Sequence, residues 1–128
     1  MAKVALVVDD SMLIRYAICR FLRERGFGVE TAANGIEALD VLGRVVPDLI
    51  VTDMQMPGMS GSELITVLKS KPETRAVPII VITGHAGGLA EGDQRANSAI
   101  SKDIDVDSQL ENALRMIGNA RRGQTAGK

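Results

Sequence analysis

The chain has 128 residues with 15 basic and 16 acidic side chains, and apolar residues make up 45% of it. This balance fits one globular domain and excludes a disordered chain or a nucleic-acid binder that relies on bulk positive charge. One cysteine excludes an internal disulfide, and together with one histidine it excludes a Cys/His zinc site. Apolar runs stay well below the ~20 residues of a membrane span. We therefore expect a cytoplasmic domain that binds neither nucleic acid nor membrane.

Short apolar runs alternate with helical periodicity along the chain. The apolar runs predict strands over residues 4–8, 27–32, 49–52, 77–82 and 98–101. The helical stripes and capping signals predict helices over residues 14–22, 34–42, 60–68, 84–96 and 105–117. The helix over 84–96 is the weakest of these because this segment contains Gly84, Gly87, Gly88 and Gly92.

Five strands that alternate with helices predict βαβ units and a parallel sheet covered on both faces. The sequence shows no internal repeat and no interior linker. We expect one domain over residues 1–120 and a flexible, polar C-terminal tail over residues 121–128. Ligands of such sheets gather beyond the carboxyl ends of the strands, so the residues that follow each strand are the candidates for function.

The residues at the strand ends carry a specific chemistry. Asp9 and Asp10 follow the first strand, Asp53 the third, Thr83 the fourth and Lys102 the fifth. Clustered carboxylates repel one another unless a cation intervenes, and Mg²⁺ prefers such oxygen ligands. A lysine and a hydroxyl beside them could hold a small anion. An aspartyl nucleophile in phosphoryl transfer requires this combination of groups.

Each of these residues has a simpler structural interpretation when it is taken alone. Asp10 or Ser11 could cap the first helix, and Asp53 could be a turn residue. Thr83 alone is uninformative, and a lone lysine is usually solvated. The spacing of all the candidates places them at the same edge of the sheet, and this coincidence favours a functional site.

Four stretches match a known family together: residues 7–11 (VVDDS), 53–61 (DMQMPGMSG), 82–84 (ITG) and 96–102 (ANSAISK). With them the chain resembles the receiver domain of bacterial two-component response regulators, as found in single-domain chemotaxis regulators. The resemblance extends from about residue 3 to residue 117. It implies a doubly wound, flavodoxin-like α/β fold with strand order 2-1-3-4-5 and helices on both faces.

The resemblance also implies a role for each residue of the acidic cluster. Asp53 would accept a phosphoryl group from a histidine kinase or a phosphotransfer protein. Asp10 would ligate Mg²⁺ directly, and Asp9 would help through water. The backbone carbonyl of Gln55 would be a further metal ligand, and Asp53 itself would complete the set.

The remaining implied roles concern switching. Lys102 would pair with a phosphoryl oxygen, and the Thr83 hydroxyl would move to hydrogen-bond the phosphoryl group. A downstream protein would then bind the face formed by the predicted helix over 84–96, the strand over 98–101 and the last helix.

The chain departs from the family pattern at two positions near the lysine. Ala99 stands where the family usually has an aromatic residue that reports phosphorylation by changing rotamer. Asp103 stands where a proline usually follows the lysine. These departures put the usual readout in doubt and keep open a receiver-like adaptor that acts mainly by binding, with weak or vestigial phosphorylation.

A third possibility is a phosphatase with an aspartyl nucleophile. Enzymes of that class carry a D-x-D motif directly after a strand. Residues 53–55 of this chain read Asp-Met-Gln and lack the second carboxylate. We therefore expect a phospho-accepting regulator and not a turnover enzyme.

Overall fold

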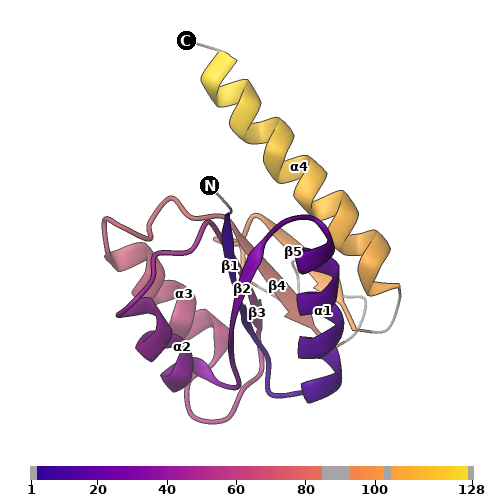
Figure 1. Cartoon of the computed structure of the whole chain (residues 1–128). Coiled ribbons are helices and arrows are strands. Elements are labelled where there is room, and N and C mark those ends of the chain that lie inside the picture. The colour runs from indigo at the N-terminus through magenta and orange to yellow at the C-terminus, as the bar shows by residue number, and fades with distance from the viewer. Residues whose placement is uncertain (1–2, 85–92, 103–104, 127–128) are drawn as a thin grey trace.

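The computed structural model describes residues 3–84, 93–102 and 105–126. Figure 1 shows strands and helices following one another along the chain. They are β1 (Val4–Val8), α1 (Met12–Glu24), β2 (Gly28–Ala32), α2 (Gly35–Leu42), β3 (Leu49–Asp53), α3 (Gly61–Ser70), β4 (Ile79–Thr83), β5 (Ser98–Ser101) and α4 (Val106–Ala126).

The strands form one parallel sheet of five strands in the order β2-β1-β3-β4-β5. The doubly wound fold expected from the sequence is therefore confirmed. Because all strands run in the same direction, their carboxyl ends meet at one edge. There the register pairs Val8 with Thr52, Asp53 with Ile82, and Thr83 with Ser101. Strands β1, β3 and β4 lie inside the sheet, whereas β2 and β5 are its edges.

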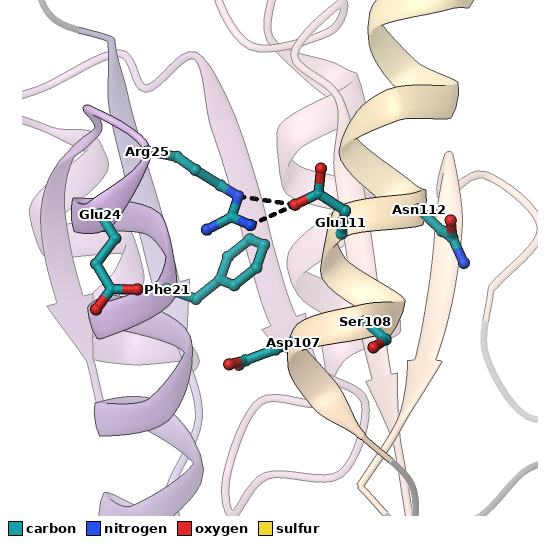
Figure 2. A pocket seen from close by; sticks show the side chains of 7 residues that line it. All are labelled: Phe21, Glu24, Arg25, Asp107, Ser108, Glu111 and Asn112. Carbon is teal, nitrogen blue, oxygen red and sulfur yellow. Dashed lines mark hydrogen bonds and ion pairs between the residues drawn. The ribbon is translucent and has the colours of Figure 1, made fainter.

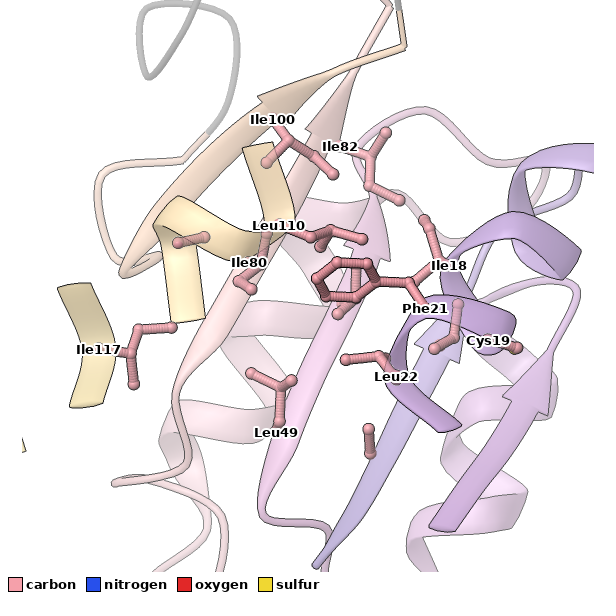
Figure 3. Packing of buried hydrophobic residues seen from close by; sticks show 14 residues of the cluster. Ile18, Cys19, Phe21, Leu22, Leu49, Ile80, Ile82, Ile100, Leu110 and Ile117 are labelled. Carbon is pink, nitrogen blue, oxygen red and sulfur yellow. The ribbon is translucent and has the colours of Figure 1, made fainter. Parts of the chain in front are cut away.

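Helices cover both faces of the sheet. Helices α2 and α3 lie on one face, and α1 and α4 lie on the other (Figure 1). Each face buries its own apolar cluster, because alternate side chains of a strand point to opposite faces. On the second face, Phe21 and Leu22 of α1 and Leu110 of α4 pack over Ile80 and Ile82 of β4 (Figure 3). This burial holds the interior strands, and with them the site, in place.

An ion pair joins the two helices of that second face. The Arg25 guanidinium contacts the Glu111 carboxylate and lies over the ring of Phe21, 3.7 Å from its centroid (Figure 2). The Arg25 Nε–Glu111 Oε1 distance is 2.9 Å. These contacts link the end of α1 to the second turn of α4, so the position of α4 is coupled to the core.

The bounds of most elements differ slightly from the sequence expectations, and three differences are informative. Strand β4 begins at Ile79 and not at residue 77, because Pro78 has no N–H to donate to a ladder. Residues 93–96 form a turn where we predicted the end of a helix, closed by the Ala96 N–H and the Asp93 carbonyl. Residues 85–92 of that predicted helix lie outside the described residues.

The third difference is at the C-terminus. The backbone of α4 is helical through Ala126, where we expected irregular chain from residue 121. Within the described part of the chain, no helix has the length and apolar composition needed to cross a membrane.

Candidate functional site

Three carboxylates meet at the carboxyl edge of the sheet. Asp9, Asp10 and Asp53 each place one carboxylate oxygen so that all three oxygens lie within 4.8 Å of one another. The fold causes this, because β1 and β3 are neighbours and both end here. Asp9 and Asp53 are buried, whereas Asp10 is exposed to solvent.

The sequence left open whether Asp10 or Ser11 caps the first helix. Ser11 is the N-cap of α1, and its hydroxyl accepts a hydrogen bond from the Ile14 N–H at 3.4 Å. The cap therefore does not need Asp10. The exposed carboxylate of Asp10 remains beside the two buried ones, where a cation could reach it.

Asp9 is fully buried, and one of its oxygens is incompletely satisfied. Its Oδ1 accepts the Ser11 N–H at 2.7 Å. Among the described residues Oδ2 accepts no hydrogen bond, and its nearest cation is the Lys102 Nζ at 3.7 Å. Burial raises the pKa of this carboxyl, and the charges of Asp53 and Asp10 add to that effect, against the opposing influence of the Ser11 N–H and Lys102.

Asp53 lies between a backbone donor and a cation. Its Oδ1 accepts the Gln55 N–H at 3.1 Å, and its Oδ2 accepts a hydrogen bond from Lys102 Nζ at 3.1 Å. Burial of Lys102 opposes its charge, but the hydrogen bond that Lys102 donates to Asp53 and the charges of the three aspartates outweigh the burial and raise the pKa of Lys102. The ammonium is therefore held in its charged form beside the buried carboxylate.

Thr83 is buried at the end of β4, and the structure places its hydroxyl on the β5 side. The Thr83 Oγ1 donates to the Ile100 carbonyl at 3.3 Å, and the Lys102 N–H donates to the Thr83 carbonyl at 3.0 Å. The end of β4 and the start of the Lys102 loop are thus bonded to each other. The structure brings all the predicted strand-end residues to one edge, with Thr83 bonded to β5.

The donor set fits a hard divalent cation. Three carboxylates within 4.8 Å concentrate negative charge, and a buried Asp9 oxygen lacks a hydrogen-bond donor among the described residues. Oxygen ligands of this kind suit Mg²⁺, which also retains several waters and therefore tolerates a partly exposed site. Asp9, Asp10 and Asp53 are the residues that could hold it.

The turn after β3 brings α3 close to Asp53. Gly58 has a φ of +82°, in the left-handed region that glycine adopts without strain. At Gly61 an added Cβ would lie 2.5 Å from the Asp53 carbonyl oxygen and 2.8 Å from the Met54 Cα. Ser60 and Glu63 form the predicted capping box there. Glycine at position 61 therefore lets the helix begin directly against the strand that carries Asp53.

Two residues that the sequence did not single out support the site. The Arg15 guanidinium donates to the Asp9 carbonyl at 2.6 Å, and the Gln109 side chain bonds the backbone of Ser101. Arg15 follows the capping residue by one helical turn, so its proximity to the acidic pair could have been inferred from helical spacing. Gln109 carries no comparable signal, since its partner is distant in sequence.

The chain matches the family model "Response regulator receiver domain" over residues 5–115. It therefore belongs to the receiver domain family of two-component response regulators. This finding confirms the resemblance seen in the sequence motifs, and it agrees with the strand order of the sheet.

The share of a relative's length that this chain covers differs from one relative to another. The polar-differentiation response regulator DivK of Brucella anthropi is 32% identical, over 94% of this chain and 100% of the relative. The protein-glutamate methylesterase/protein-glutamine glutaminase 1 of Anaeromyxobacter dehalogenans is 41% identical over 71% of this chain, which spans only 25% of that relative. Among solved structures, chemotaxis response regulator CheY4 of Vibrio cholerae aligns with a TM-score of 0.80 and 27% identity, covering 91% of this chain and 99% of that one.

Proposed function

We propose that Asp53 accepts a phosphoryl group from a phosphohistidine of a histidine kinase or phosphotransfer protein. An Asp53 carboxylate oxygen forms the new O–P bond, the N–P bond of the donor breaks, and the imidazole leaves with the electron pair. The acyl phosphate then changes which proteins the domain binds. The observation that carries this proposal is the contact of Lys102 Nζ with Asp53 Oδ2 at 3.1 Å within the acidic cluster.

Lys102 is suited to stabilise the transferred group. Its ammonium already lies 3.1 Å from Asp53 Oδ2 and 3.7 Å from Asp9 Oδ2. Charge spreads over the equatorial phosphoryl oxygens during transfer, and a fixed cation nearby lowers the barrier. A lysine is ordinarily charged at neutral pH, and the carboxylates beside Lys102 raise its pKa further.

Asp9, Asp10 and Asp53, with the backbone carbonyl of Gln55, would hold Mg²⁺. When bound, the cation neutralises negative charge that three aspartates and a phosphoryl group would otherwise accumulate. Asp10 is exposed and could ligate the cation directly, whereas Asp9 is buried and would help through a water molecule. Asp53 therefore works as a nucleophile only in a site whose charge is balanced.

Thr83 would couple the phosphoryl group to the binding surface. To bond a phosphoryl oxygen, its hydroxyl would leave the Ile100 carbonyl, which it contacts at 3.3 Å. Ala99 provides no aromatic ring to follow this movement. The movement of Thr83 would therefore pass directly to β5 and α4. A downstream protein would bind the face that β5 and α4 form with residues 84–96. Residues 85–92, and Asp103 beside Lys102, lie outside the described residues.

The proposed protein is a regulator and not a turnover enzyme, and we place it in the cytoplasm with its kinase. The family match and the similarity to the solved CheY4 structure support the regulatory role at the level of fold and class. This chain spans only 25% of the length of the methylesterase, so we do not assign that enzyme's activity to it.

Intact-mass spectrometry after incubation with acetyl phosphate tests the proposal. The wild-type protein should gain one phosphoryl group with Mg²⁺ and little or none when EDTA removes the cation. Asp53→Asn should gain none, because the amide is not a nucleophile, while Asp40→Asn, at an exposed position on α2, should label like wild type. A wild-type chain that stays unlabelled would instead support the adaptor hypothesis.

A further inference from the structure

Strand β5 is an edge strand, and the residue before Lys102 lies on its open side. The Lys102 N–H bonds the Thr83 carbonyl of β4. Backbone groups of successive residues in a strand point in opposite directions, so the N–H and C=O of Ser101 face away from β4. Such groups at an edge normally have no strand to pair with.

The side chain of Gln109 takes the place of that missing strand. Its Oε1 accepts the Ser101 N–H at 2.8 Å, and its Nε2 donates to the Ser101 carbonyl at 2.8 Å. A side-chain amide has one acceptor and one donor group and can therefore bond both backbone groups of one residue. Ser101 is buried and Gln109 is half-buried, so water competes weakly for these bonds.

The position of Gln109 is itself fixed by α4. Its N–H donates to the Asp105 carbonyl at 3.2 Å, and the neighbouring Leu110 is fully buried in the core. The Asp105 carboxylate accepts the Ser108 N–H at 3.3 Å and caps the helix start. The amide is therefore presented to β5 by a helix whose register the core determines.

We propose that Gln109 is a positioning residue for Lys102. It fixes both backbone groups of Ser101, and Lys102 is the next residue, so the clamp determines where the lysine leaves the strand. Its ammonium must reach the Asp53 carboxylate from the edge strand, a contact that is 3.1 Å long. This inference rests on the proposed function, because it assigns Gln109 a role only if Lys102 stabilises the phosphoryl group.

The proposal predicts a selective defect in Gln109→Leu. The three aspartates lie at the ends of β1 and β3 and not on β5, so the affinity for Mg²⁺ alone should not fall below that of wild type. The affinity for beryllofluoride with Mg²⁺, and the rate of labelling by acetyl phosphate, should each fall about 3- to 10-fold, as expected for two lost hydrogen bonds that act through Lys102. Gln109→Glu keeps the acceptor for the Ser101 N–H but loses the donor to the Ser101 carbonyl, so it should show a defect of the same kind, with Mg²⁺ affinity again unaffected.

A matched control and a double-mutant cycle separate positioning from a general structural effect. Asn112→Leu makes a similar amide-to-leucine change on α4 at an exposed residue, and it should behave as wild type. In a Lys102→Ala background, Gln109→Leu should slow labelling no further, because its effect requires the lysine. Additive effects, or an equal loss of Mg²⁺ affinity, would overturn the proposal.

The outcomes also distinguish this inference from the proposed function. If wild type neither binds beryllofluoride nor accepts phosphate, the proposed function fails, and the role of Gln109 fails with it. If wild type does both and Gln109→Leu, Gln109→Glu and Asn112→Leu all match it, only the positioning role is wrong.

Discussion

The two halves of the site are built on different parts of the sheet. Asp53 is the last residue of β3, and Asp9 and Asp10 directly follow β1. Both strands have a hydrogen-bonded strand on each side. Lys102 follows β5, which has β4 on one side and an open edge on the other, where Gln109 supplies the missing bonds. The inner half is therefore held by the sheet itself, whereas the outer half depends on single side chains. We therefore expect that some substitutions change cation binding alone and others change phosphoryl binding alone.

Lys102→Ala is expected to separate the rate of phosphoryl labelling from the affinity for Mg²⁺ most strongly. Removal of a cation that stabilises transition-state charge should slow labelling by acetyl phosphate about 10²–10³-fold. The same change removes a positive charge that lies 3.1 Å from Asp53 and competes with a metal ion, so the affinity for Mg²⁺ should stay equal or increase. Isothermal titration calorimetry measures the affinity for Mg²⁺, and labelling reactions quenched at successive times measure the rate of labelling. Lys71→Ala, an exposed lysine after α3, is the control, and a parallel loss of both quantities would mean that the halves are not separable.

Within the inner half, substitution of Gly61 should have the largest effect on stability and on Mg²⁺ binding. An alanine Cβ would meet the Asp53 carbonyl oxygen at 2.5 Å, so the backbone that carries Asp53 must move. We expect Gly61→Ala to lower the free energy of unfolding by about 2–3 kcal/mol and to weaken Mg²⁺ binding. Gly58→Ala has open space around its Cβ and should cost only the strain of its positive φ, about 1–2 kcal/mol. Chemical denaturation measures both, and equal costs would argue against the close approach at Gly61.

Mg²⁺ should stabilise the folded chain through the inner half alone. At ten times its dissociation constant the cation should add about 1.4 kcal/mol to the free energy of unfolding, because it binds the folded state. Asp10→Asn should remove most of this increment, whereas Asp40→Asn should keep it. Calorimetry with and without Mg²⁺ provides the comparison. An increment that survives in Asp10→Asn would place the cation elsewhere.

The smallest effect on the free energy of unfolding is expected at Asp93 and Arg95, in the turn that precedes β5. The Arg95 side chain and N–H donate to the Asp93 carboxylate and hold its pKa well below its usual range. A lowered folded-state pKa adds stability that is fully present above the ordinary value of about 3.9, and this stability is lost progressively as the pH falls from that value toward the lowered folded-state pKa. Because Arg95 is partly exposed, Asp93→Asn should cost at most about 1 kcal/mol at pH 7. The difference between the unfolding free energies of wild type and variant should stay constant from pH 7 to about pH 4 and begin to narrow below it, and a difference that stays constant down to pH 3 would exclude ionisation as the cause.

The sequence predicted the inner half better than the outer half. The apolar run at Val4–Val8 and the acids that follow it determine β1 and Asp9 by local pattern alone. The strand order came from the family resemblance, since periodicity does not specify which strands are neighbours. The clamp from Gln109 to Ser101 could not be predicted, because an amide on a helix gives no local sign of a backbone partner on a different element.

The boundaries that differed have local causes as well. Pro78 delays β4, and the turn at residues 93–96 is stabilised by Asp93 and Arg95, which the glycine count of the preceding segment did not reveal. The direction of the Thr83 hydroxyl toward Ile100 was also not evident from the sequence. A threonine gives no sign of which neighbour it bonds until the strands are placed.

The most direct test of the account is to locate the phosphoryl group on the wild-type protein. Borohydride reduces an aspartyl phosphate to homoserine, so treatment after labelling in Mg²⁺ marks the acceptor without any mutation. Tandem mass spectrometry of the peptide that contains residues 49–60 should then find homoserine at position 53. Homoserine at another aspartate, or phosphate on a residue outside this peptide, would contradict the assignment of Asp53.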